Sequence, residues 1–281
     1  MRSPSLEFAV AACLQAGRTL IEAFRSPSVA WAKDDQFNVV TSADLASEAI
    51  LVDAIVRDFP GSAIIAEERG FQAGVNDETW IIDPLDGTSN FVAGIPWFGI
   101  LLARVRNGVP DLGVMYLPAL EQLYTAEAGK GAFCNGERLC VSTGASLKDA
   151  LWAYGIDGTG RDSVARFQSN VLNKLLHEVR NIRTTNCLLD AAFTSDGRFG
   201  GMLNWNTRLW DIVAPSLIVR EARGLYTMVD GENIDFDFSP SGLDRSYAVL
   251  AGAPILHEQV AALVRSVAMG SSSTGPTPEP S

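Results

Sequence analysis

Two aspartates three residues apart are the groups in this sequence best suited to chemistry. Asp83 and Asp86 lie in residues 80–91, where an apolar run gives way to Pro84 and Gly87. This pattern predicts a buried strand that ends in a turn. Two carboxylates and a backbone carbonyl of such a turn supply oxygen ligands, which suit Mg²⁺ better than a softer metal. The small residues that follow can open a helix and bind a phosphate oxygen through their amides.

The same residues also have an ordinary structural interpretation. Asp, Pro and Gly are common in tight turns, and an aspartate before a helix is often a cap. An EF-hand is excluded, because it needs acidic groups at alternate positions and a closing glutamate, and this segment has neither. The metal hypothesis therefore depends on acidic residues elsewhere in the chain.

Such residues occur at three other places. Glu67 and Glu68 follow an apolar run that predicts a short strand, so they would lie at a strand end beside Asp83. Asp211 stands before an apolar helical segment and is either an N-cap or a further metal ligand. Asp44 begins another expected helix, where the alternative is a carboxylate favoured by the helix dipole.

Composition and charge limit the function classes. The chain has 281 residues, 47% of them hydrophobic and 20% charged, which is typical of a globular protein with a substantial core. Its net charge of -11 argues against a nucleic acid polymer or an anionic membrane as partner. A small anionic substrate would need bound cations to approach the site.

The histidines and cysteines also limit the chemistry and the location that we expect. His177 and His257 both fall in amphipathic helical stretches that we expect near the surface, which disfavours histidine-based or zinc chemistry. The four cysteines lack a metal-ligand spacing and no secretory segment is apparent, so we expect reduced thiols and a cytoplasmic location. No apolar run is long enough for a membrane span.

The pattern of elements predicts two subdomains and a tail. Residues 1–145 read as an α+β subdomain that carries the metal-binding motifs, with helices at 5–25 and 42–58, strands at 63–66 and 79–83, and antiparallel strands over 98–141. Residues 146–269 are predicted to form an α/β subdomain. Its expected helices lie near 161–178, 187–196 and 211–223, and its expected strands lie near 180–184, 225–229 and 247–251. We expect residues 270–281 to be a disordered tail.

Several motifs in this order resemble the inositol monophosphatase-like family of metal-dependent, lithium-sensitive phosphatases. The resemblance rests on the Glu67-Glu68 pair, the DPLDGTSNF segment from Asp83, the GKGAFCNG hairpin from Gly129, and the WD pair at Asp211. It covers nearly the whole chain and implies a layered αβαβα sandwich with the active site between two subdomains.

The resemblance also implies roles for individual residues. The metal ligands would be the side chains of Glu67, Asp83, Asp86 and Asp211 and the carbonyl of Leu85, holding two or three Mg²⁺ ions, for which Mn²⁺ can substitute. Thr88 and Asp44 would orient and deprotonate the attacking water, and Glu68 is grouped with them as catalytic. The substrate site would comprise Leu85, Asp86, Gly87, Thr88, Asn186, Cys187, Asn204 and Asp211, with the phosphate on the amides of Gly87 and Thr88. Lys33 stands where the family often has a loop lysine.

Some positions depart from the family pattern. Asn186 and Cys187 replace small residues that touch the substrate, and Asn204 stands seven before Asp211, where inositol-specific members have a glutamate. We therefore doubt myo-inositol 1-phosphate as the main substrate, and expect another hydroxyl pattern or a carbonyl-bearing or amine-bearing substrate. Asn38 and Pro215 also depart from the pattern but touch no metal ligand.

The expected function is Mg²⁺-dependent hydrolysis of a small polyol, sugar or related phosphate monoester by direct attack of water. Alternatives with the same chemistry are a histidinol-phosphate phosphatase, a fructose-1,6-bisphosphatase and a 3′-phosphonucleotide phosphatase. An inactive metal-binding interaction module is the alternative from another class. The resemblance further implies a homodimer, with the hairpin region as a plausible interface.

Overall fold

Strand β5 (Glu78–Asp86) is an interior strand of the larger of the two main sheets and carries Asp83 and Asp86 at its C-terminal end. The computed structural model describes residues 2–25, 30–32, 39–158 and 161–271. The larger sheet has the strand order β10-β9-β8-β7-β6-β5-β3-β4. Its other strands are β3 (Ala63–Ala66), β4 (Gly70–Gln72), β6 (Gly99–Arg106), β7 (Val109–Leu117), β8 (Gln122–Glu127), β9 (Gly131–Cys134) and β10 (Glu137–Arg138).

Most of this sheet is the antiparallel meander that the sequence predicts. Asn107 and Gly108 join β6 to β7, and Asn135 and Gly136 join β9 to β10, all four with positive φ. Two successive positive φ angles give the turn that matches the twist of the flanking strands. The exception is β3, which lies parallel to β5 with Ala66 beside Ile82. The chain therefore leaves both strands at the same edge of the sheet.

The smaller sheet lies wholly after residue 150. Its strand order is β12-β11-β13-β15-β14, with β11 parallel to both its neighbours and the other pairs antiparallel. Its strands are β11 (Leu151–Tyr154), β12 (Asn181–Arg183), β13 (Gly201–Thr207), β14 (Leu225–Met228) and β15 (Tyr247–Gly252). A separate two-stranded ribbon pairs β1 (Ala30–Ala32) with β2 (Val39–Thr41).

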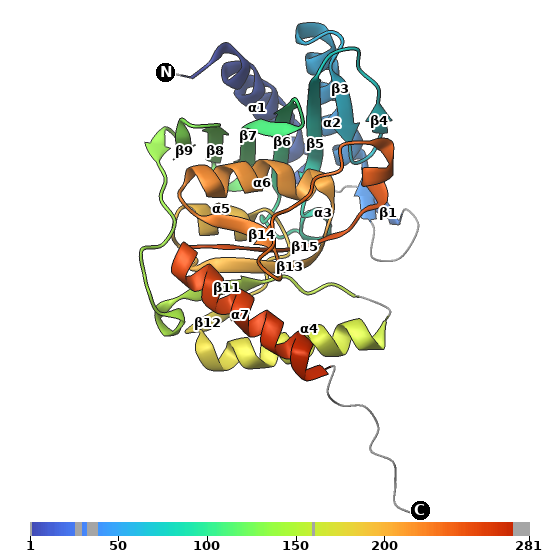
Figure 1. Ribbon diagram of the computed structural model, residues 1–281. Coiled ribbons are helices and arrows are strands. Elements are labelled where there is room, and N and C mark those ends of the chain that lie inside the picture. Colours follow the sequence, from blue (N-terminus) through green and yellow to red (C-terminus); the bar gives the residue numbers. More distant parts are fainter. Residues whose placement is uncertain (1, 26–29, 33–38, 159–160, 272–281) are drawn as a thin grey trace, which may run out of the picture.

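Helices complete an αβαβα arrangement of alternating layers (Figure 1). Helices α1 (Pro4–Phe24) and α2 (Ser42–Asp58) cover the outer face of the larger sheet. Helices α5 (Leu189–Ser195) and α6 (Leu209–Glu221) lie between the sheets, and α4 (Asp162–Glu178) and α7 (Pro254–Ser271) cover the far face of the smaller one. Short helical turns occur at α3 (Thr88–Val92), η1 (Pro118–Leu120), η2 (Leu147–Asp149) and η3 (Pro240–Asp244). The predicted α+β sandwich is confirmed.

The larger sheet is buried on both faces. Along β5, Trp80 and Ile82 pack toward α1 and α2, whereas Ile81 packs into the core shared with the middle helices. In β6, Leu102 packs toward α1 and α2, and Leu101 packs into the core shared with the middle helices. Continuous apolar strands of this kind are typical of a sheet covered by helices on both sides. This burial holds the end of β5 rigidly, so its aspartates are fixed in position.

Three expectations about individual regions meet different outcomes. His177 is exposed as predicted, but the prediction for His257 is wrong: it is only 1% exposed, with Nε2 2.8 Å from Thr227 Oγ1. Pro215, which departs from the family pattern, lies inside α6, and this helix begins at Leu209, before the WD pair. The expected subdomain boundary at 145/146 falls between β10 and β11. The first two residues of the expected tail at 270–281 belong to α7, and the others lie outside the described residues.

The cysteines and helices add two observations. All four cysteines are free, in agreement with the expected reduced thiols. Among the described residues, no helix combines the length and the apolar composition that crossing a bilayer requires.

Candidate active site

The chain around Asp83 and Asp86 forms an irregular strand end, where the sequence predicts a turn. β5 continues to pair with β6 as far as Asp86, with a shift of register after Asp83. Pro84, which has no amide hydrogen to give to the ladder, falls inside this irregular step. Asp83 Oδ1 accepts a hydrogen bond from the Leu85 amide at 3.0 Å, and Ser47 Oγ donates to the Pro84 carbonyl at 2.7 Å. These two bonds fix the bend.

Three aspartates converge at this point. Asp83, Asp86 and Asp211 each offer a carboxylate oxygen, and these oxygens all lie within 4.8 Å of one another. Burial, together with neighbouring carboxylates, raises the pKa of Asp83 well above its usual value and raises those of Asp86 and Asp211 to about 7. Buried carboxylates so close together repel unless a proton or a cation neutralises them. The cluster therefore favours cation binding.

Asp211 contacts the start of α6 and at the same time faces the acidic cluster, although the N-cap itself is Arg208. It is the third residue of α6, and its Oδ2 accepts a hydrogen bond from the Arg208 amide at 2.7 Å, which caps the helix. The same carboxylate faces Asp83 and Asp86. The amide of Leu188, the residue just before α5, donates to Asp86 Oδ1 at 2.5 Å. The second half of the chain thus both completes and orients the cluster.

Glu67 lies next to the cluster because β3 and β5 are parallel. It follows β3 directly, its amide donates to the Ile82 carbonyl at 3.2 Å, and it lines the same cleft as Asp83. Glu68 is not among the residues that line this cleft. Its amide instead donates to Oε2 of the fully buried Glu48 at 2.8 Å. The structure therefore brings Glu67 to the site but not Glu68.

Thr88 and Asp44 form the expected pair. Thr88 Oγ1 is 3.1 Å from Asp44 Oδ1 and 2.9 Å from the Leu85 carbonyl oxygen. Asp44 Oδ2 accepts hydrogen bonds from the amide and hydroxyl of Thr41, at 2.8 and 2.6 Å. Burial raises the pKa of Asp44, and these hydrogen bonds oppose the rise. Asp44 is thus a helix-capping residue with one oxygen directed at Thr88.

Gly87 places Thr88 at the start of α3. Its φ of +84° is in the left-handed region, and a Cβ added there would lie 2.6 Å from the Trp97 carbonyl oxygen. Only glycine satisfies both conditions without strain. The residues at this bend, Gly87, Thr88 and Ser89, line the cleft beside Asp86.

These donors fit Mg²⁺. One cleft is lined by Glu67, Asp83, Leu85, Asp86 and Asp211. The four carboxylates and the Leu85 carbonyl are all oxygen donors. Hard cations such as Mg²⁺ prefer oxygen ligands, and none of these donors is the nitrogen or sulfur that zinc sites favour. The excess of buried negative charge attracts the cation.

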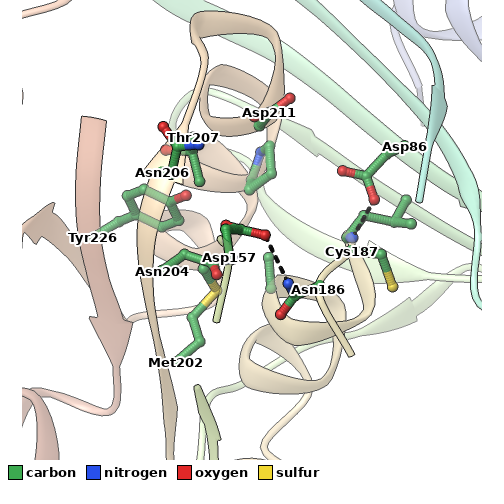
Figure 2. Close-up of a pocket in the computed structure, with 13 residues that line it drawn as sticks. Asp86, Asp157, Asn186, Cys187, Met202, Asn204, Asn206, Thr207, Asp211 and Tyr226 are labelled. Atoms are coloured by element: carbon green, nitrogen blue, oxygen red, sulfur yellow. Dashed lines mark hydrogen bonds between the residues drawn. The ribbon is translucent and has the colours of Figure 1, made fainter. Parts of the chain in front are cut away.

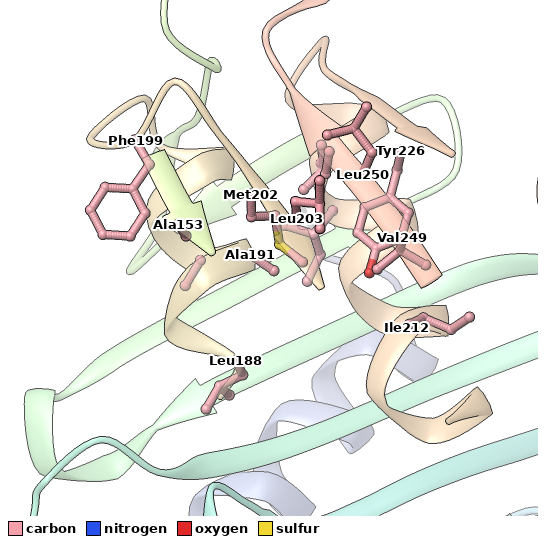
Figure 3. Packing of buried hydrophobic residues seen from close by; sticks show 14 of the residues in the cluster. Ala153, Leu188, Ala191, Phe199, Met202, Leu203, Ile212, Tyr226, Val249 and Leu250 are labelled. Carbon is pink, nitrogen blue, oxygen red and sulfur yellow. The ribbon is translucent and has the colours of Figure 1, made fainter. Parts of the chain in front are cut away.

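The cleft of about 610 Å³ continues into a side pocket of about 120 Å³. Asn186, Cys187 and Asn204 line this pocket, and Asp86 and Asp211 form the wall toward the cluster (Figure 2). The expected substrate residues are therefore brought together with the metal ligands. The apolar floor, which includes Leu188, Ala191, Met202 and Tyr226, belongs to the core between the sheets (Figure 3).

Sequence reasoning missed several residues of the site. Asp157 and Asn206 line both the cleft and the side pocket, and Arg208 lines the cleft. Asp157 follows β11, and Asn206 lies within β13. The sequence pattern did not predict either strand. Buried Glu48 and Ser47 support the site from α2, where nothing in the helical pattern distinguishes them from ordinary polar positions. The expected positions Lys33 and Asn38 lie outside the described residues.

Comparison with known proteins decides the family. The sequence matches the model of the inositol monophosphatase family over residues 1–269. The chain belongs to the inositol monophosphatase family. The members of this family are phosphatases, so the prediction of a phosphatase is confirmed.

Individual family members show how similar the chain is to characterised proteins. It is 36% identical over 231 residues to the fructose-1,6-bisphosphatase/inositol-1-monophosphatase of Thermotoga maritima, covering 82% of this chain and 84% of that protein. The structure of the extragenic suppressor protein suhB of Bartonella henselae superposes with a TM-score of 0.86 and 30% identity, covering 94% of this chain and 99% of that one. An IMPase/NADP phosphatase complexed with Mg²⁺ and phosphate shares the fold, with a TM-score of 0.76, 24% identity and coverage of 92% and 94%.

Proposed function

We propose that this chain is a Mg²⁺-dependent phosphomonoesterase that hydrolyses a small polyol, sugar or related phosphate by direct attack of water. The observation that carries the proposal is that Thr88 lines the same cleft as the acidic cluster, with buried Asp44 3.1 Å behind its hydroxyl. A carboxylate-backed hydroxyl beside a cation-binding cluster is suited to orienting water toward a bound phosphate. The complex of a same-fold phosphatase with Mg²⁺ and phosphate supports the choice of ion.

Different residues of the site are proposed to activate the water and to bind the phosphate. Thr88, while donating to Asp44, can accept a hydrogen bond from the attacking water, and Asp44 is the base toward which the proton moves. The amides of Gly87 and Thr88 are suited to donate to phosphate oxygens. Mg²⁺ held by the acidic cluster would acidify water and neutralise charge on the phosphate and the leaving oxygen. The mechanism needs no covalent intermediate.

The substrate alcohol would occupy the side pocket. Asn186, Cys187 and Asn204 line it in place of the groups that the family resemblance associates with inositol, so another alcohol is proposed. Histidinol phosphate, fructose 1,6-bisphosphate and 3′-phosphonucleotides are the alternatives within the same chemistry. A panel of these phosphate esters, together with inositol 1-phosphate, separates the candidates by rate of phosphate release.

The test of the reaction itself uses the purified chain in H₂¹⁸O. Direct attack of water on phosphorus places one solvent oxygen in the released phosphate and none in the alcohol. Label in the alcohol would show attack at carbon and overturn the proposed route. Family resemblance also leads us to propose a cytoplasmic homodimer, and light scattering of the purified chain tests the dimer.

A further inference from the structure

Asp157 is a carboxylate in the active-site cleft that neither the acidic cluster nor the Asp44–Thr88 pair uses. It lies three residues after the end of β11 and lines both the cleft and the side pocket. Figure 2 shows its side chain among the residues that line the pocket, joined to Asn186 by a hydrogen bond. It therefore borders the space that the alcohol of a bound phosphate ester would fill.

Asn186 holds Asp157 in this position. Its Nδ2 donates to Asp157 Oδ1 at 2.8 Å and to the Ile156 carbonyl at 2.6 Å, and its Oδ1 accepts from the Ile156 amide at 3.0 Å. Asn186 has a φ of +50°, a conformation that asparagine tolerates better than most residues. The paired bonds between an amide side chain and a peptide group fix the backbone next to Asp157. Its carboxylate is therefore preorganised rather than free to turn away.

The surroundings offer Asp157 little positive charge. Among the described residues that line the cleft and the side pocket, Arg208 is the only basic one, and its Nη1 donates to the Asp244 carbonyl at 2.6 Å. Burial raises the pKa of Asp157, and the hydrogen bond from Asn186 lowers it. The Mg²⁺ ions of the proposed function would neutralise the acidic cluster and leave Asp157 as a further negative group. A partly buried carboxylate of this kind is stabilised by a cation from the substrate.

The rest of the side pocket suits a small amine. Asn204, Asn206 and Thr207 supply neutral polar groups, and the pocket is small, with a volume of about 120 Å³. The pocket lining contains no arginine, lysine or histidine among the described residues. A second phosphate or a carboxylate on the substrate would meet Asp157 without a compensating cation. These features favour an amino alcohol over a sugar bisphosphate.

We propose that Asp157, held by Asn186, is a specificity residue that binds a protonated amino group, so that the enzyme prefers phosphate monoesters of small amino alcohols. This inference rests on the proposed phosphatase function. It adds the chemical class of the alcohol, which the acidic cluster does not define. Because Asp157 is proposed to contact the substrate and not the attacking water, its removal should lower the preference for the amine.

The experiment compares matched pairs of substrates. The probes are 2-aminoethyl, 3-aminopropyl and 4-aminobutyl phosphate, each beside the ester with a hydroxyl in place of the amine. For the chain length that spans the pocket, kcat/KM of the wild type should favour the amine by roughly 10- to 100-fold, as expected for one hydrogen bond to a charged group. Asp157→Asn should reduce this preference to near unity, because kcat/KM for the amine ester should fall far more than kcat/KM for the hydroxyl ester.

Asp162→Asn is the matched control, because Asp162 is an exposed carboxylate five residues further along, at the start of α4. It should keep the wild-type preference. Equal kcat/KM for amine and hydroxyl esters at every length in the wild type, with phosphate still released, would overturn this inference alone. Retention of the amine preference in Asp157→Asn would overturn it as well. No phosphate release from any ester with Mg²⁺ present would overturn the proposed function and this inference together.

Discussion

Asp44 joins the first turn of α2 to the first residue of α3 through Thr88, with 3.1 Å between Asp44 Oδ1 and Thr88 Oγ1. The second oxygen of Asp44 is occupied by the amide and hydroxyl of Thr41. One carboxylate therefore caps a helix and positions a hydroxyl in the cleft. Because both oxygens are engaged, the orientation of Thr88 toward the cluster is set before substrate binds.

Loss of this pair should lower turnover more than binding. Asp44→Asn and Thr88→Ala should each reduce kcat by roughly 100- to 10,000-fold, the usual range for a general acid or base, with a small change in KM. Thr88→Ser, which keeps the hydroxyl, should recover much of the rate. Steady-state phosphate release measures both constants. A Thr88→Ala variant with wild-type kcat would show that the hydroxyl does not orient the water.

Stabilisation by Mg²⁺ should depend on pH in a defined direction. In the metal-free protein the pKa values of Asp86 and Asp211 are raised to about 7, whereas in the unfolded chain they are about 4. Raised values favour the protonated folded state, so these groups stabilise the metal-free fold at low pH and lose that contribution as pH rises toward 7. Mg²⁺ needs the ionised carboxylates, so its effect grows over the same range.

Thermal unfolding with and without MgCl₂ measures this dependence. The increase in melting temperature caused by Mg²⁺ should be small at pH 5.5 and larger at pH 8. Asp211→Asn should reduce the increase at pH 8, because a cluster ligand is lost. An increase that is equal at both pH values would contradict the assignment of these aspartates as the cation ligands.

Glu48 should matter for the site although it does not touch the cleft. Its carboxylate is fully buried, accepts from the Glu68 amide and lies 3.3 Å from Arg69 Nε. Glu48→Ala would leave this amide without its partner and should destabilise the fold by about 1–3 kcal/mol. It should also raise the Mg²⁺ concentration needed for half-maximal activity, because the turn carrying Glu67 would loosen. Urea unfolding and a Mg²⁺ titration test the two effects, and Glu48→Gln should show smaller changes in both.

Two glycines of similar conformation allow a controlled test of the backbone at the bend. Gly87 and Gly94 have φ values of +84° and +75°, but only Gly87 has atoms within 4 Å of an added Cβ. Gly94→Ala should cost about 1–2 kcal/mol, the penalty for a left-handed residue with a side chain, and leave kcat unchanged. Gly87→Ala should cost more and lower kcat, since Thr88 must move. Equal effects of the two changes in urea unfolding and turnover would show that the close approach to Trp97 is unimportant.

Regular local patterns account for the parts of the fold that were predictable from sequence. The Asn-Gly pairs at 107 and 135 require positive φ angles, so they mark hairpins wherever they join apolar runs. The helices α1 and α2 follow their apolar periodicity. β13 was missed because Asn204 and Asn206 place polar groups into the active-site pocket, which disrupts the apolar pattern of the strand. His257 was misplaced because periodicity cannot show that Thr227 meets it in the core.

The candidate site also contains residues that could be predicted from the sequence and residues that could not. Asp83, Asp86, Glu67 and Asp211 stand at ends of elements that the sequence reveals, so their convergence could be expected. Asp157 stands beyond a strand that no local pattern marks, and its role depends on a contact with Asn186 that is 29 residues away in the chain. Long-range contacts of this kind are set by tertiary packing, which one sequence does not display.

The most direct test of the central claim is a Mg²⁺ titration of phosphate release by the wild type beside Asp211→Asn. Both proteins should be folded in metal-free buffer, as circular dichroism can check. Phosphate release by the wild type should be absent in the presence of EDTA and rise with Mg²⁺ to saturation, whereas Asp211→Asn should stay roughly 100-fold or more lower at every concentration. Phosphate release that is independent of Mg²⁺, or unchanged in Asp211→Asn, would contradict the assignment of this cluster as a cation-dependent phosphatase centre.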